Sequence, residues 1–164
     1  MPKEPPSALN KAMALLAIRP LSERELLEKL RKAGYPDREC DDAIAECVRR
    51  RYLDDDQLTE DAVAALRQRN VGAAQIRLRL RRRGLDAEKV STLLDADREE
   101  EIAAARRAAE GKLRLLARES DPRKKREKLF RFMIARGFAP GVVMQVIGRS
   151  VLPDWSERVT VWLR

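Results

Sequence analysis

The sequence contains no histidine, only two cysteines, and few aromatic residues, which make up 4% of its 164 residues. Without histidine, the chain lacks the commonest general base and the commonest metal ligand. No apolar run approaches the roughly 18 residues of a membrane-spanning helix. The N-terminal MPKEPPSALN also lacks the apolar stretch of a secretory signal. These absences argue against an enzyme with a histidine base and against a membrane protein, and we expect a cytoplasmic location.

Disulfide, metal and nucleotide sites are also not expected. Cys40 and Cys47 are seven residues apart on one expected helix, about 10 Å along its axis, too far for a disulfide with each other. We expect both to be buried, reduced thiols. Neither GxGxxG nor GxxxxGK[ST] is present. The acidic run at 54–56 is interpreted as a helix N-cap and not as a metal site. The sequence therefore predicts no metal, no cofactor and no catalysis.

Three segments of the sequence share one apolar pattern when they are aligned on a glycine. The glycines are Gly34, Gly84 and Gly137, which lie 50 and 53 residues apart. Apolar residues recur eight and four residues before each glycine, and one, six and ten residues after it. They are Leu26, Leu30, Tyr35, Cys40 and Ile44 in the first copy, Ile76, Leu80, Leu85, Val90 and Leu94 in the second, and Leu129, Met133, Phe138, Val143 and Ile147 in the third. A period near fifty residues indicates tandem structural repeats.

Capping and periodicity signals predict three helices in each copy. The expected ranges are 8–18, 22–33 and 37–50, then 56–69, 73–83 and 87–95, then 97–118, 122–136 and 140–148. Ser22 with Glu25 forms a capping box, Asp37 is the expected N-cap of the third helix, and Asp121 before Pro122 starts another helix. The expected inward stripe of the helix over 97–118 is Ile102, Ala105, Ala109, Leu113 and Leu116.

The expected fold is all-α, with three tandem three-helix repeats in an elongated, curved array. We expect a flexible leader over 1–7, repeats over 8–51, 52–95 and 96–149, and a tail over 150–164 that forms a short docked helix. Nothing in the sequence is typical of a strand. Such an array presents an extended surface instead of a central pocket, which favours a function in binding.

Positive charge is concentrated in the second repeat. The formal net charge is +8, and residues 62–85 hold seven arginines and no acidic residue. Ile76 and Leu80 would be buried, which turns Arg77, Arg81 and Arg82 outward, where their guanidinium groups suit phosphate or carboxylate. A second basic run starts at 123 and includes Lys124, Lys125 and Lys128. The alternative interpretation is that both runs are solvated helix faces.

The order and spacing of four stretches resemble the RecX family of bacterial recombination regulators. These stretches are LAIRPLSERELLEKLRKAGY (16–35), YLDDDQL (52–58), GAAQIRLRLRRRGLD (72–86) and LFRFMIARGFAPGVVMQVI (129–147). Two departures are Leu58-Thr59, where the family usually has Phe-Ala, and Arg79, where an acidic residue is common.

The resemblance implies a non-enzymatic regulator that binds RecA and its filament on single-stranded DNA. It implies inhibition of filament extension, ATP hydrolysis and strand exchange, and hence a role in DNA repair and the SOS response. Carried onto this sequence, the expected contact residues for RecA or DNA phosphate are Arg77, Arg81, Arg82, Lys124, Lys125 and Lys128. We expect a monomer with at most weak direct contact to DNA.

Two alternatives remain open at this stage. One is an α-helical repeat module that binds nucleic acid directly, without RecA. The other is a scaffold that binds another helical protein, which the scarcity of aromatic residues disfavours.

Overall fold

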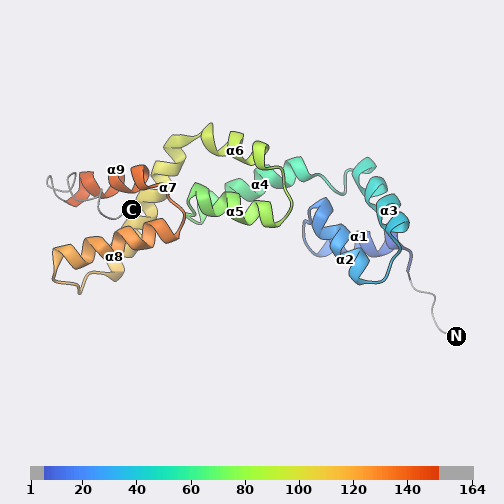
Figure 1. Cartoon of the computed structure of the whole chain (residues 1–164), viewed down its shortest axis with the longest axis horizontal. Coiled ribbons are helices and arrows are strands. Elements are labelled where there is room, and N and C mark those ends of the chain that lie inside the picture. The colour runs from blue at the N-terminus through green and yellow to red at the C-terminus, as the bar shows by residue number, and fades with distance from the viewer. Residues whose placement is uncertain (1–5, 152–164) are drawn as a thin grey trace. The chain divides into compact units, whose positions relative to one another are not determined.

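The computed structural model describes residues 6–151, and within that range the chain holds nine helices and no strand (Figure 1). The helices are α1 Ala8–Ile18, α2 Glu23–Lys32, α3 Asp37–Arg49, α4 Asp55–Gln68, α5 Ala73–Arg82, α6 Ala87–Asp95, α7 Arg98–Leu115, α8 Pro122–Ala135 and α9 Pro140–Val151. The prediction of an all-α protein made of three-helix repeats is confirmed. The chain divides into two compact units, one holding residues up to 62 together with 79–90, the other 63–78 together with the residues from 91 onward.

Most helices begin at the residues that the capping signals predict. The Ser22 hydroxyl accepts from the backbone N–H of Glu25, and the Glu25 carboxylate accepts from the backbone N–H of Ser22, which completes the expected capping box. Asp121 caps α8 ahead of Pro122. The expectation that Asp37 caps α3 is wrong. The N-cap is Pro36, and Asp37 is the first helical residue, where a negative charge favours the helix dipole.

The turn after the second helix of each repeat is built the same way three times. Gly34, Gly84 and Gly137 have φ of +92°, +81° and +88°, a conformation that glycine adopts without steric cost. The next residue's N–H donates to the carbonyl five positions earlier in each turn, at 3.3, 3.1 and 3.2 Å. This is the Schellman arrangement, and it explains why the repeat aligns on its glycines.

The first three helices bury a small core in the first unit. α1, α2 and α3 contact one another in pairs. Their core residues are Ala8, Ala12, Leu21, Leu26, Leu30, Cys40, Ala43, Cys47 and Leu53. Cys40 and Cys47 are both buried and free, as expected, and burial raises the pKa of each thiol. Of the expected leader, residues 6 and 7 contact this unit, because the Tyr35 hydroxyl donates to the Pro6 carbonyl at 2.6 Å and Ser7 caps α1.

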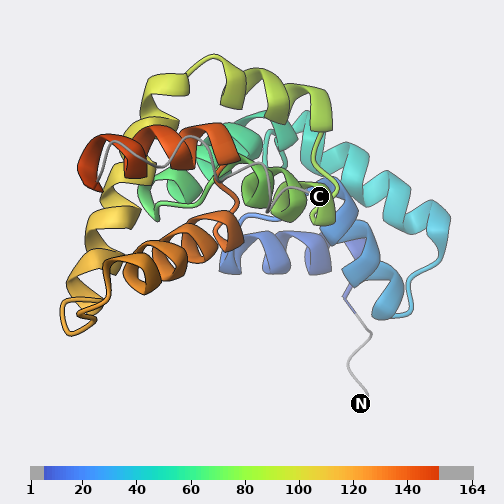
Figure 2. The same ribbon diagram turned by 60° about the vertical axis from the view of Figure 1, so that its left-hand side comes forward.

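The last three helices bury a second core in the second unit, where α7, α8 and α9 (yellow, orange and red in Figure 2) also contact one another in pairs. Their core residues are Ala104, Ala105, Ala108, Ala109, Leu129, Met133, Phe138, Val142, Val143, Val146 and Ile147. The expected stripe on α7 is only partly correct. Ala105 and Ala109 are buried, whereas Ile102, Leu113 and Leu116 are half-buried at the edge of the core. Four alanines form the buried face instead, because their small side chains leave room for the larger residues of α8 and α9.

The boundary between the two units runs through the second repeat, α4–α6. The expected repeat boundaries at 51/52 and 95/96 therefore stay predictions. Thr59, a departure from the family pattern, is fully buried, and its hydroxyl donates to the Asp55 carbonyl at 2.6 Å. The polar atom that this threonine brings into the interior is thus satisfied. Of the expected tail over 150–164, residues 152–164 lie outside the described residues, as do residues 1–5 of the leader.

Candidate partner-binding surface

Arg77, the first of the expected contact residues, is engaged within the second unit. Its guanidinium donates to Asp95 at 2.9 Å and to the Ser91 hydroxyl at 3.4 Å, both on α6. The Arg77 side chain is 42% exposed. Because an acidic partner already neutralises it, Arg77 is a weaker candidate for a contact than its place in the sequence indicates.

Arg79, Arg81 and Arg82 form an exposed basic surface on the last turn of α5, in the first unit; we call it the α5 basic surface. None of the three makes an ion pair or a hydrogen bond with the side chain of a described residue. Leu80, between them in the sequence, is 1% exposed, so it anchors the turn from which they project. Cations are also favoured at a helix C-terminus. These three side chains are free to bind an anionic partner.

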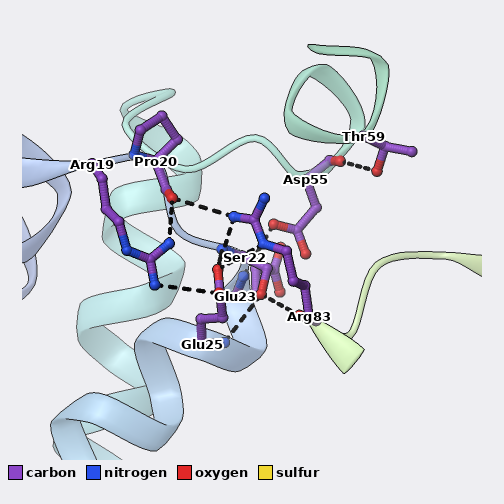
Figure 3. Close-up of polar contacts among 8 residues, drawn as sticks. All are labelled: Arg19, Pro20, Ser22, Glu23, Glu25, Asp55, Thr59 and Arg83. Carbon is purple, nitrogen blue, oxygen red and sulfur yellow. Dashed lines mark hydrogen bonds and ion pairs between the residues drawn. The ribbon is translucent and has the colours of Figure 1, made fainter. Parts of the chain in front are cut away.

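Arg83, the last arginine of the run, belongs to the internal structure of the first unit (Figure 3). Its guanidinium donates to Glu25 at 2.9 and 3.2 Å and to the Pro20 carbonyl at 3.3 Å. Its own carbonyl accepts from the Ser22 hydroxyl at 2.5 Å. Arg83 therefore joins the turn after α5 to the start of α2 and is not available to a partner.

Glu25 is the centre of this polar cluster (Figure 3). Burial alone would raise the pKa of its carboxyl, but hydrogen bonds from Arg83, from the Ser22 backbone and from Arg19 lower the pKa below its ordinary value. The neighbouring acids shift the other way. Burial raises the pKa of Asp55, and burial together with the charge of Asp55 raises that of Glu23.

Arg136 makes the equivalent contacts within the second unit. Its guanidinium donates to the carbonyls of Asn70 and Arg69 at 2.9 and 2.6 Å, and its own carbonyl accepts from the N–H of Gly72 at 2.9 Å. The guanidinium also lies 5.4 Å from the centre of the Phe132 ring, a distance at which cation–π attraction operates. Like Arg83, it joins a turn after a second helix to the start of the second helix of the preceding repeat.

The sequence carries a signal for these two arginines that the prediction of contact residues did not use. Arg83 and Arg136 both stand immediately before the aligned glycine of their repeat, whereas the first repeat has Ala33 there. Comparison of the repeats position by position would have separated these structural arginines from the exposed ones.

The basic run at the start of α8 also contains both lysines without a partner among the described residues and a lysine that is paired within the fold. Lys124 is exposed and Lys125 half-buried, with no hydrogen bond or ion pair from their side chains to described residues. Lys128 donates to Glu119 at 2.5 Å, and this contact lowers the pKa of the Glu119 carboxyl. Of the three lysines expected here, Lys124 is therefore the most accessible to a partner.

Acidic residues that could suggest a metal site have structural roles. Asp54 accepts from the N–H of Gln57 at 2.9 Å and so caps α4, as expected. Asp56 pairs with Lys89 at 3.0 Å, and this contact raises the pKa of Lys89. In the described part of the chain, no group of three or more potential metal ligands occurs. Likewise, none of the helices within residues 6–151 combines the length and apolar character that a membrane crossing requires.

Comparison with known proteins gives matches over most of the chain. Residues 8–47 match the first three-helix domain of RecX, and residues 99–147 match the third. The regulatory protein RecX of Chlorobaculum tepidum is 34% identical over 153 residues, which cover 93% of this chain and 92% of the relative. The regulatory protein RecX of Legionella pneumophila is 29% identical over 140 residues, 85% of this chain and 91% of the relative.

A solved structure supports the fold independently. The crystal structure of RecX from Lactobacillus salivarius superposes with a TM-score of 0.75 over 87% of this chain and 93% of that one, at 19% identity. The family models, the level of identity and the repeated three-helix architecture agree with one another. This chain belongs to the RecX family.

Proposed function

We propose that this protein is a non-enzymatic regulator that binds the RecA recombinase and its filament on single-stranded DNA. Bound there, it inhibits filament extension, ATP hydrolysis and strand exchange. The relatives are named regulatory proteins, and the family resemblance supplies RecA as the target. The observation that carries the proposal is the α5 basic surface, three exposed arginines on one helical turn with no acidic partner among the described residues.

The charge of the chain supports a polyanionic target. The net charge is +8, and the described structure neutralises part of the basic run internally, through Arg77 and Arg83. The cations left over include Arg79, Arg81 and Arg82 in the first unit and Lys124 in the second. Several modest contacts of this kind, spread along one chain, suit a filament that presents the same surface many times.

The proposal is tested by measuring RecA ATPase activity on single-stranded DNA while this protein is titrated in, at about 50 and about 200 mM salt. We expect inhibition at protein concentrations below those needed to coat the DNA, and we expect it to persist at the higher salt. Unchanged ATPase activity at every concentration would overturn the proposal.

Direct binding of nucleic acid is the second candidate, favoured by the same free arginines. It predicts binding to single-stranded DNA without RecA, and an affinity that falls steeply with salt because condensed counterions are released. DNA binding measured by fluorescence anisotropy under the same two conditions separates the candidates. If raising the salt concentration abolishes both DNA binding and the inhibition of RecA ATPase activity, the result would favour this second function.

A further inference from the structure

A pocket of about 500 Å³ opens within the second unit, between the starts of α5, α7 and α9 and the end of α6. Its walls include small residues: Ala73, Ala74, Gly137, Ala139 and Gly141. Four charged residues also line it: Arg77, Asp95, Arg98 and Glu101. A volume of this size lies within the range of about 300 to 1,000 Å³ that small-molecule sites occupy.

Several of the donors that an anion would need at this pocket are already used. At the start of α5, the N–H groups of Gly72 and Ala74 donate to the carbonyls of Arg136 and Gly137, just after α8, at 2.9 and 3.0 Å. Asp97 caps α7 at 3.0 Å, and α9 begins with Pro140, which has no N–H. The Arg77 guanidinium is paired with Asp95. These contacts leave fewer donors at the pocket for a phosphate or a carboxylate.

Of the four charged residues at the pocket, Arg98 and Glu101 form no ion pair with a described residue, and Glu101 is the less exposed of the two. Its Oε1 atom is covered by the protein and accepts no hydrogen bond from any described residue. Arg67, which lies with Glu101 at a neighbouring small cavity, donates instead to the Leu94 and Asp97 carbonyls at 3.0 and 3.2 Å. A half-buried carboxylate without a donor is costly, and a cation that supplies donors would relieve this cost.

We propose that this pocket binds a basic side chain of a protein partner, with the Glu101 carboxylate turning from its covered position to receive the guanidinium or ammonium group. Arginine fits best, because its planar fork of donors matches a carboxylate. The alanine and glycine walls accept the aliphatic stem, and the volume leaves room for adjacent peptide backbone. Arg98 lies three residues before Glu101 on α7, is exposed and lines the same pocket. Its guanidinium could pair with Glu101 itself and would then compete with the partner's side chain. The inference stands apart from the proposed function, because it concerns a different surface and a different charge.

The test is an NMR titration of the isotope-labelled full chain with Nα-acetyl-arginine amide, and with the citrulline analogue as a neutral control of the same shape. We expect the arginine compound to shift the amide signals of Ala73, Ala74 and Gly141, and the citrulline compound to leave them in place. Glu101→Gln should weaken binding roughly tenfold, the value of a lost charge-assisted contact. The matched control is Glu110→Gln, an exposed acid on the same helix that does not line the pocket, and it should bind normally.

A second variant blocks the pocket without disturbing the fold. A side chain at Gly141 would meet no atom within 4 Å, and this glycine lies in the first turn of α9 without a positive φ. Gly141→Leu should therefore fold normally and lose binding of the arginine compound. Shifts elsewhere but not at the pocket, or equal binding by Glu101→Gln, would overturn the proposal. Tighter binding of spermidine than of the arginine compound would overturn the assignment to a protein side chain.

Discussion

The Ser22 hydroxyl and the Arg83 carbonyl are joined by a hydrogen bond of 2.5 Å across 61 positions of the sequence. The same serine caps α2, so one residue both starts a helix and fixes the junction with the next repeat. Arg83 completes the junction with its side chain, which binds Glu25 and the Pro20 carbonyl. The stability of the first unit therefore depends on a polar cluster as well as on its small apolar core.

Replacing Arg83 should destabilise the first unit. The side chains of Arg83 and Glu25 are 26% and 20% exposed, so Arg83→Met leaves a largely covered carboxylate with fewer donors. We expect the free energy of unfolding to fall by about 1 to 2 kcal/mol, measured by urea denaturation. Arg82→Met, a matched change at an exposed neighbour, should cost less than about 0.5 kcal/mol. Equal losses from both changes would contradict the role given to Arg83.

The contribution of Glu25 should depend on pH with a defined sign. Its folded-state pKa lies below the ordinary value of 4.5, so the folded state binds this proton less readily than the unfolded state does. The ionised Glu25 carboxylate therefore stabilises the folded state at pH values above its ordinary pKa. This stabilisation is lost as the pH falls through the lower, folded-state pKa. The difference in unfolding free energy between the wild type and Arg83→Met should therefore shrink between about pH 6 and about pH 3. A difference that stays constant over this range would rule out the ion pair as its source.

Arg136 should contribute at least as much to the stability of the second unit as Arg83 does to that of the first. Arg136→Met removes two hydrogen bonds to carbonyls and the contact with the Phe132 ring, for an expected loss of about 2 to 3 kcal/mol. Arg131→Met, on the exposed face of α8, is the control; it removes only an exposed ion pair with Glu127 and should lie near the wild type. Thermal unfolding followed by circular dichroism measures both. Similar unfolding midpoints for the two variants would disprove the junction.

Two glycine substitutions should have opposite effects. At Gly72 a Cβ atom would lie 2.2 Å from backbone atoms of Gly137 and Phe138, a distance that forces the two segments apart. At Gly111, inside α7, a Cβ atom would meet nothing within 4 Å. Gly111→Ala should therefore stabilise the protein by about 0.5 to 1 kcal/mol. Gly72→Ala should lower the unfolding free energy by more than about 2 kcal/mol, and a neutral result there would refute the close approach.

The apolar repeat allowed much of the fold to be predicted from the sequence. In all three copies the residues eight and four positions before the glycine are at most 2% exposed, as at Leu26, Ile76 and Leu129. Such positions follow from helical periodicity alone, so sequence is enough to find them. The buried face of α7 was harder to predict, because its alanines contribute little to a hydrophobic pattern.

The fate of each arginine was less predictable, because its partner lies on another helix. Periodicity shows that Arg77 and Arg83 do not face the core. It does not show that Arg77 forms an ion pair with Asp95 and Arg83 one with Glu25. Those partners are 18 and 58 residues away in the sequence. A run of like charge therefore separates into structural and exposed members only when the tertiary fold is known.

The most direct test of the central claim is charge reversal at the α5 basic surface. The variant Arg81→Glu with Arg82→Glu is compared, in the RecA ATPase assay on single-stranded DNA, with Arg38→Glu and Arg106→Glu combined. This control changes the net charge equally at two exposed arginines away from α5. If the surface docks on the filament, the first variant should need roughly ten to a hundred times more protein for half-inhibition, while its helical signal is kept and the control inhibits like the wild type. Equal inhibition by both variants would contradict the account.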